Sequence, residues 1–421
     1  MCRILKNMFG DVRCTSTQVT PVILERILAS NISKGSFINL PKAKDARVSK
    51  SQLYSPLPSL THFTRRFSSL LCSQADEKRM CLSRTSLFKT ASSLSFSMDL
   101  FADKITLSVF WAPQIWDNLK IEHEELIEKT EVGILTVSKS TDWWQNTLGG
   151  FVVEMKQDEK AKPTLFSFAS RHHDSMQEFS SRYVHPTGLH PTLELEVSSS
   201  KPPVEEGDAQ CKLHTHLTLP KEIFVDKYQL SDPLFLASKK LSSVKYITTP
   251  VDLEAPAYAV NEWGSTVLLE LAPPTTTTEE WTAQIPLHLR YLAPNNATSG
   301  QSKIKIPSPV LFWACTPSVS LAETDLTNNP FDFTTLGYDT FFEEGTLFYH
   351  VDSKVGRGEK SLVSDISVPV LDLDKAWYVE YGTAIVVGLG FVWVLWCLGR
   401  VFWGGSGMKE TVEREKQKKV Q

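Results

Sequence analysis

The chain has 421 residues, a formal net charge of −4 and 42% hydrophobic residues, which is enough for one large domain or two ordinary ones. Its lysines are scattered, and no strongly basic face with interleaved aromatic residues occurs, which argues against a nucleic-acid-binding protein. Residues 1–30 include basic side chains but lack the apolar core and the small-residue cleavage site of a signal peptide.

Residues 1–97 form the first part of the chain and are rich in Ser, Thr, Lys and Arg. Their weak periodicity predicts a partly ordered N-terminal segment, in which Val22–Leu28 and Leu60–Leu71 have the pattern of short helices. Asn31 begins an Asn-Ile-Ser tripeptide, which is a candidate acceptor for N-glycosylation.

Residues 98–375 change to short apolar or alternating runs between turn residues, which predicts a mainly β, sandwich-like domain or two such domains. The clearest runs are Ile105–Trp111, Gly133–Val137, Thr192–Val197, Leu213–Leu219, Thr266–Leu271, Ile285–Tyr291, Val310–Cys315 and Ile366–Leu373. Asn296 begins an Asn-Ala-Thr acceptor in a polar loop between two of these runs, and it is the second glycosylation candidate.

Six cysteines precede the C-terminal apolar segment, and an even number in an oxidising compartment permits three disulfides with fifteen connectivities. Proximity in sequence makes Cys2 with Cys14 and Cys72 with Cys81 the simplest pairs, which leaves Cys211 with Cys315.

Histidines and carboxylates are the candidates for chemistry in this part. His214 and His216 lie two apart on a predicted strand and share one face, a spacing that can chelate a metal, but no further ligand is specified by spacing. We expect these imidazoles to hydrogen-bond on the solvated face of a sheet. Asp252 and Glu254 could suit glycoside chemistry, although acidic strand ends look the same. No nucleophile elbow, phosphate loop or dinucleotide fingerprint occurs. We therefore expect no catalytic residue, no cofactor and no metal.

Tyr381–Gly399 is a run of uncharged residues that, as a helix rising about 1.5 Å per residue, just crosses a hydrocarbon core of about 30 Å. With its aromatic flanks it predicts a transmembrane helix over 376–403, followed by a hinge at Gly404–Gly407 and a basic tail over 404–421. A partner helix could approach this helix closely at its small residues, which are Gly382, Ala384, Gly388 and Gly390.

Charges on the two sides of this helix predict its orientation. The residues behind it are mainly basic and those before it mainly acidic, which places the tail in the cytosol and the bulk of the chain on the opposite side. Lys418 and Lys419, four and three residues from the carboxyl terminus, have the form of a dilysine signal for retrieval to the endoplasmic reticulum.

Several of these segments resemble the PIG-X/PBN family, in particular its filamentous-fungal members. The matching segments are Lys162–His173, His185–Leu193, Leu213–Leu230, Asp232–Leu236, Asp252–Pro256, Ile285–Leu292, Val310–Cys315 and Gly388–Trp396. They occur in order and cover most of residues 98–403.

The resemblance implies an endoplasmic-reticulum membrane protein with a lumenal β domain and one C-terminal span. It further implies a non-catalytic, stabilising subunit of glycosylphosphatidylinositol (GPI) mannosyltransferase I, whose multi-span, PIG-M-type partner adds the first mannose to the anchor precursor. No active-site residues carry over from the family.

Two further readings stay open at this stage. A general lumenal chaperone for secretory or membrane proteins is the main alternative, and an enzyme that acts on glycans through the histidines and carboxylates is another. The absence of a signal peptide also has two explanations. Either the chain inserts tail-first, with its bulk in the cytosol, or it enters by an unusual route or lacks its true beginning. The resemblance favours a missing beginning, because fungal members extend beyond the segment that resembles Met1–Cys14.

Overall fold

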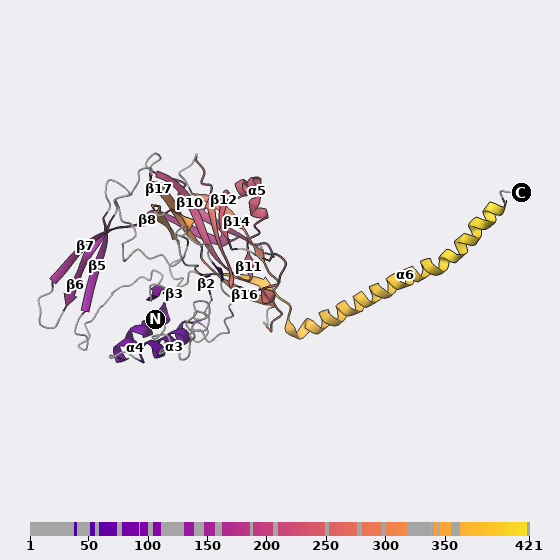
Figure 1. Ribbon diagram of the computed structural model, residues 1–421, viewed down its shortest axis with the longest axis horizontal. Helices are drawn as coiled ribbons and strands as arrows, with labels where there is room; N and C mark the ends of the chain where they lie inside the picture. The colour runs from indigo at the N-terminus through magenta and orange to yellow at the C-terminus, as the bar shows by residue number, and fades with distance from the viewer. Residues whose placement is uncertain are drawn as a thin grey trace. The chain divides into compact units, whose positions relative to one another are not determined.

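The computed structural model describes most of the β-rich region and the C-terminal helix (Figure 1). The described residues are 38–39, 51–54, 59–73, 78–91, 93–99, 104–110, 130–138, 147–155, 162–185, 188–204, 209–248, 252–275, 280–296, 300–317, 338, 341–343, 345–354 and 363–418. By contacts between Cα atoms the chain divides into two compact units, one formed by 1–291 and 304–366 and the other by 292–303 and 367–421.

The first unit is built on an eight-stranded sheet with the strand order β12-β13-β10-β17-β18-β8-β9-β14. In that order the strands are β12 (Leu241–Ile247), β13 (Gly264–Leu271), β10 (Ala209–Pro220), β17 (Val310–Pro317), β18 (Leu347–Ser353), β8 (His172–Tyr183), β9 (Thr192–Val197) and β14 (Trp281–Pro286). Neighbouring strands are antiparallel except β18 and β8, which are parallel.

The two edges of this sheet approach each other at Gln284 of β14 and Lys239, just before β12. The backbone N–H of Gln284 donates to the carbonyl of Lys239 at 3.0 Å, and the Lys239 Nζ donates to Gln284 Oε1 at 3.0 Å. The Gln284 amide also donates to Glu194 on β9 at 3.1 Å. The sheet therefore curls, and one of its faces lines an apolar interior.

Directly paired residues on neighbouring strands share a face, so the register identifies which side chains line this interior. Leu213 pairs with Trp313, and Trp313 pairs with Tyr349. Leu195 pairs with Ala283, and these side chains are all buried. Burial of this layer stabilises the folded domain by about 25 cal/mol for each Å² of apolar surface removed from water.

The remaining strands form small sheets. They are β1 (Ile38–Asn39) with β2 (Ser51–Gln52), β3 (Ser93–Asp99) with β4 (Lys104–Phe110), β5 (Thr130–Ser138) with β6 (Thr147–Met155) and β7 (Lys162–Ala169), β11 (Ile223–Phe224) with β15 (His288–Leu289), and β16 (Gln301–Pro307) with β19 (Val363–Pro369).

Helices are few among the described residues before position 373. They are α3 (Thr61–Leu71), α4 (Lys78–Ser86), η2 (Leu87–Thr90), η4 (Gln229–Ser231), α5 (Pro233–Ser238) and η5 (Ala257–Ala259). The α3 helix buries Phe63 and Phe67, which lie one turn apart and stack with their ring centroids 5.6 Å apart. The α5 helix begins where the Asp232 carboxylate accepts the Leu234 N–H at 2.9 Å and Pro233 occupies the first turn.

The second unit contains η7 (Leu373–Lys375) and α6 (Ala376–Lys418), a single helix of 43 residues (Figure 1). The stretch Leu373–Phe402 has a mean hydropathy of 2.1 and is long and apolar enough to cross a membrane. The helix runs through Gly404–Gly407, so the expectation of a hinge there is wrong for the backbone. Helical hydrogen bonds to the flanking turns outweigh the cost of about 1 kcal/mol per glycine.

The fold class is confirmed, because the described chain is mainly strand with one C-terminal apolar helix. All eight apolar runs named from the sequence contain strands. The run at 285–291 is divided between β14 and β15, with a break at Leu287, and the helix expected at Leu60–Leu71 is α3. Val22–Leu28 lies outside the described residues, and the boundaries at 97 and 375 stay predictions.

Candidate functional site

Four histidines lie on the sheet face opposite the apolar interior. In the register His214 pairs with Phe312, Phe312 pairs with His350, and Phe348 pairs with His172, while His216 follows two residues after His214. We call this side, with His172, His214, His216 and His350, the histidine face.

The expectation that His214 and His216 lie on a solvated face is wrong, because each is only 2% exposed. Aromatic rings cover them. Phe342 meets the His214 ring edge-on with centroids 5.0 Å apart, and Tyr338 lies 5.6 Å from the His216 ring. Both faces of this part of the sheet are therefore buried. The alternation of polar and apolar residues in the sequence does not distinguish a strand buried on both faces from one with a solvated face.

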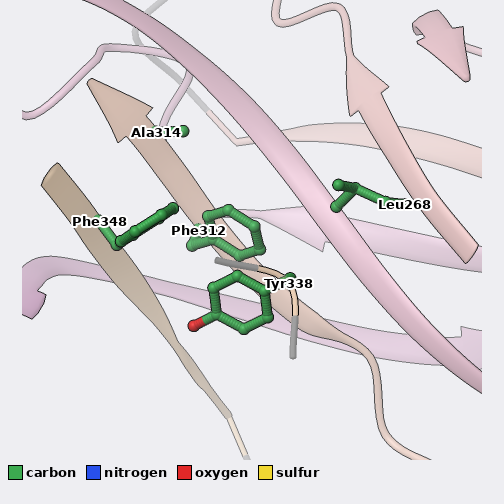
Figure 2. Packing of buried hydrophobic residues seen from close by; sticks show 5 residues of the cluster. All are labelled: Leu268, Phe312, Ala314, Tyr338 and Phe348. Atoms are coloured by element: carbon green, nitrogen blue, oxygen red, sulfur yellow. The ribbon is translucent and has the colours of Figure 1, made fainter. Parts of the chain in front are cut away.

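Tyr338 lies at the centre of this cover (Figure 2). Its ring stacks on Phe312 with centroids 4.4 Å apart and meets Phe348 edge-on at 5.6 Å. Leu268 and Ala314 complete the buried cluster. We call Tyr338 with 341–343 and 345–346 the aromatic strap. Sequence reasoning missed it, although the adjacent aromatic pair Phe341-Phe342 was a visible signal.

Burial keeps these histidines neutral. It lowers the pKa of His216 to about 4 and, with smaller contributions from His350, Arg171 and His173, the pKa of His172 to about 3. The rings of His172 and His350 bond to each other, with Nδ1 3.0 Å from Nε2. Neutral imidazoles in this setting act as packing groups and as hydrogen-bond partners for one another.

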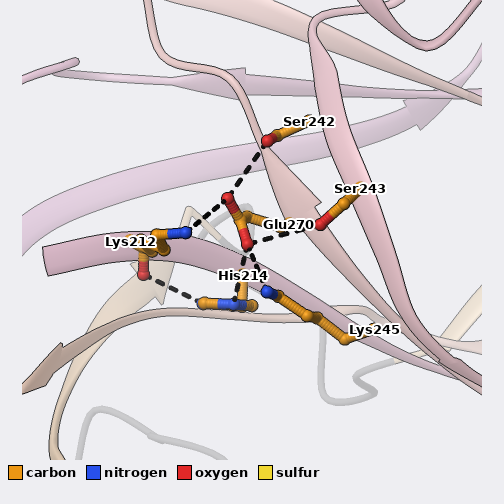
Figure 3. A network of polar contacts seen from close by, with 6 residues as sticks. All are labelled: Lys212, His214, Ser242, Ser243, Lys245 and Glu270. Carbon is orange, nitrogen blue, oxygen red and sulfur yellow. Dashed lines mark hydrogen bonds and ion pairs between the residues drawn. The ribbon is translucent and has the colours of Figure 1, made fainter. Parts of the chain in front are cut away.

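A polar network borders the histidine face at Glu270 (Figure 3). Lys245 Nζ lies 2.7 Å and Lys212 Nζ 3.3 Å from the Glu270 carboxylate, and Ser242 donates to it at 3.0 Å. Desolvation raises the pKa of Glu270, but the hydrogen bond and charge of Lys245, with help from Ser242 and Lys212, outweigh it and bring the pKa to about 2. His214 Nε2 lies 3.9 Å from the same carboxylate.

This arrangement gives no sign of a metal centre. In the part of the chain that the structure describes, no three His, Cys, Asp or Glu side chains come together as metal ligands. Asp252 and Glu254 do not form a catalytic pair of facing carboxylates either. The Asp252 carboxylate accepts the backbone N–H groups of Ala255 and Glu254, which lower its pKa and shape a turn.

Within the described part of the chain, disulfides join two pairs of segments. Disulfides connect Cys72 with Cys81, between α3 and α4, and Cys211 with Cys315, which are directly paired residues of β10 and β17. Both are pairings expected from the sequence. Cys2 and Cys14 lie outside the described residues.

The two glycosylation candidates differ in what the structure says of them. Asn31 lies outside the described residues, whereas Asn296 is exposed. Its neighbour Asn295 donates its N–H to the carbonyl of Leu371 at 3.2 Å and accepts the N–H of Leu373 at 3.1 Å, within the unit that contains α6. Occupancy by a glycan stays a prediction.

The small residues of α6 do not share one side. Successive helical residues turn by about 100°, so Ala384 and Gly388 lie about 40° apart, while Gly382 and Gly390 lie on the far side of the helix. The four small residues expected to form one docking surface therefore form two narrow ones, Ala384 with Gly388 and Gly382 with Gly390. Lys418 is the last residue of α6, Lys419 lies outside the described residues, and the retrieval signal stays a prediction.

Comparison with known proteins decides the family. A family model described as PIG-X / PBN1 matches residues 186–399. Protein pbn1 of Neurospora crassa is 40% identical over 401 residues, covering 94% of this chain and 75% of that protein. Protein pbn1 of Emericella nidulans is 36% identical over 442 residues, covering 100% and 79%. The chain belongs to the PIG-X/PBN1 family.

The likeness extends beyond filamentous fungi. Protein PBN1 of Saccharomyces cerevisiae is 27% identical over 299 residues, covering 68% of this chain and 62% of that protein. PIG-X/PBN1 membership supports an accessory role in GPI-anchor biosynthesis, in association with the endoplasmic reticulum and a mannosyltransferase partner. The single C-terminal apolar helix fits a membrane-anchored protein.

Proposed function

We propose that this chain is the non-catalytic, stabilising subunit of the GPI mannosyltransferase I complex in the endoplasmic reticulum. Its partner would be the multi-span, PIG-M-type catalytic subunit, which adds the first mannose to the anchor precursor. The observation that carries the proposal is the family match over 186–399, which includes most of the eight-stranded sheet and the apolar part of α6.

The mechanism that we propose is mass action. A subunit that binds only the native form of its partner lowers the free energy of that form and so reduces the fraction that unfolds and is degraded. A ligand present at about 100 times its dissociation constant stabilises the native form by about 2.7 kcal/mol. This mechanism requires a rigid, folded surface and no catalytic group on the accessory chain.

The residues singled out for chemistry are accounted for by structural contacts, which supports this proposal over an enzyme. His214 and His216 pack under the aromatic strap, and Asp252 shapes a turn. A glycan-processing enzyme would instead lose activity after His214→Ala or His216→Ala while its folding stayed intact.

The membrane helix offers a contact that can be tested by itself. Without a hydrophobic driving force between helices in lipid, close approach at small residues provides much of the packing. Apart from the neighbouring residues and backbone of the helix itself, no described atom lies within 4 Å of a Cβ built at Gly388 or Gly390. We infer that the side with Ala384 and Gly388 meets a helix of the partner.

Co-purification from mild detergent tests the proposal. The full-length chain should recover one multi-span mannosyltransferase as its main membrane partner. Gly388→Leu should reduce that recovery, whereas Gly390→Leu, on the far side of α6, is the matched control and should leave it unchanged. Recovery of many unrelated glycoproteins would favour a general lumenal chaperone, and recovery of no mannosyltransferase would contradict the proposal.

A further inference from the structure

The histidine face and the aromatic strap form a closed layer in which several polar atoms have no partner. Neither ring nitrogen of His216 has a hydrogen-bond partner, nor has Nε2 of His214. A buried polar atom without a partner costs roughly 1–3 kcal/mol. The closed layer is therefore less stable than its apolar contacts alone would make it.

Besides its ring contacts with the histidine face, the strap is joined to neighbouring elements by polar and aromatic contacts. Arg171 donates from Nε to the carbonyl of Thr346 at 2.9 Å and from Nη2 to the carbonyl of Glu343 at 3.1 Å. Phe341 packs on Tyr246 with ring centroids 4.6 Å apart. The Tyr338 hydroxyl lies 3.4 Å from Nε2 of His350. None of the described residues of the strap belongs to a strand of the sheet.

We propose that the aromatic strap is an acid-released latch, which covers the histidine face at neutral pH and detaches when the histidines beneath it take up protons. The proposal is independent of the proposed function. Detachment would expose a surface of His214, His216, Phe312, Phe348 and His350 while the apolar interior on the other side of the sheet stays packed.

Charge and burial determine the direction of the effect. Under the strap the imidazoles are held neutral by burial; once exposed, each recovers an ordinary pKa near 6.5. Below that pH, each histidine that becomes solvated favours the open form by about tenfold per pH unit, until the pH reaches its pKa in the closed form. Several such histidines make the opening steep.

Charged groups around the histidine face modulate this pH effect without cancelling it. They are Glu270, Lys245 and Lys212 beside His214, Asp174 beside His350, and Arg171 and His173 beside His172. Glu343 on the strap is exposed. For His216 burial alone lowers the pKa, so this residue is the clearest test.

Hydrogen exchange of the full-length chain in detergent, between pH 7 and pH 4.5, tests the latch after correction for the intrinsic pH dependence of exchange. In this range the peptide over 338–346 should open as the pH falls. The logarithm of its opening equilibrium constant should change by about two or more per pH unit, which corresponds to the uptake of about two or more protons. The peptide over 264–271 should keep its protection. A slope of one or less, simultaneous opening of both peptides, or no opening would overturn the proposal.

Matched variants separate the latch from general acid unfolding. His216→Leu should lower the slope by about one proton, whereas His173→Leu should leave it unchanged. His173 is a suitable control because it is buried and contacts Tyr349 on the opposite face. Phe342→Ala, a second variant, should raise opening at every pH with the slope unchanged. Equal slopes for both histidine variants would contradict the latch.

Discussion

Glu270 is a carboxylate whose side chain is only 9% exposed, and it shows how this domain tolerates charge beside an aromatic layer. Lys245 and Lys212 approach from neighbouring strands and keep their own charged ends partly in water. A buried charge that keeps its partners is tolerated, but removal of one partner leaves an uncompensated group. Loss of one member of the network should therefore cost more stability than the intact network contributes on balance.

Replacement of Glu270 tests this point. Glu270→Gln should lower the free energy of unfolding by about 1–3 kcal/mol, because it removes the charge that holds two lysines and leaves their hydrogen bonds poorly paired. Chemical denaturation of the purified chain in detergent measures the change. Glu280→Gln is the control, because its pair with Lys354 is about half exposed and should contribute less than about 1 kcal/mol. Equal effects would contradict this account.

The buried histidines also predict that the overall stability of the fold decreases at acidic pH. Their folded pKa values, near 3 to 4, lie below the ordinary value of 6.5, so the unfolded chain binds more protons than the folded chain between these limits. Stability should be complete above pH 6.5 and should fall as pH drops towards 4. His173→Leu should make this fall shallower in urea titrations across the pH range. A stability that stays constant down to pH 5 would disprove the prediction.

The same histidines show where sequence reasoning stops at this scale. Their spacing correctly predicts that His214 and His216 share a face. It does not predict that the face is buried, because the covering rings of Tyr338 and Phe342 lie more than a hundred residues further along the chain. No residue in or next to the strand indicates that these distant rings will cover it.

At the scale of elements, strand positions were predictable and strand neighbours were not. Alternation in Thr192–Val197 and Leu213–Leu219 predicts strands directly. Pairing depends on contacts that are distant in sequence, such as the parallel pair β18 and β8 and the closure between Gln284 and Lys239. The long apolar helix α6 was the most predictable element, because its length and the lack of charge in its apolar part are sufficient signals for a helix that could cross a membrane.

The two described disulfides should differ in their contribution to stability. Cys211 and Cys315 are separated by 104 residues, and Cys72 and Cys81 by nine. In the chain-entropy account the longer closure contributes about 4.7 kcal/mol and the shorter one about 2.6 kcal/mol. Thermal unfolding of the two double serine variants should therefore show the larger loss for Cys211→Ser with Cys315→Ser. A larger loss for the other pair would contradict this order.

At the scale of the whole molecule, the charge bias around α6 predicts that the β-rich bulk is lumenal and the tail cytosolic. Protease added to sealed microsomes should remove an epitope placed after Lys418 and leave residues 98–375 intact. After detergent is added, both should be digested. Digestion of 98–375 in sealed vesicles with the tail protected would reverse the topology and make the lumenal account untenable.

The central claim is that this chain maintains the amount of its mannosyltransferase partner and does not take part in the chemistry. The most direct measurement is a chase of the partner protein in cells with and without this chain, together with mannose transfer per partner molecule in microsomes. The account predicts a shortened partner half-life and unchanged activity per surviving molecule. Normal partner abundance with lost activity per molecule would contradict it.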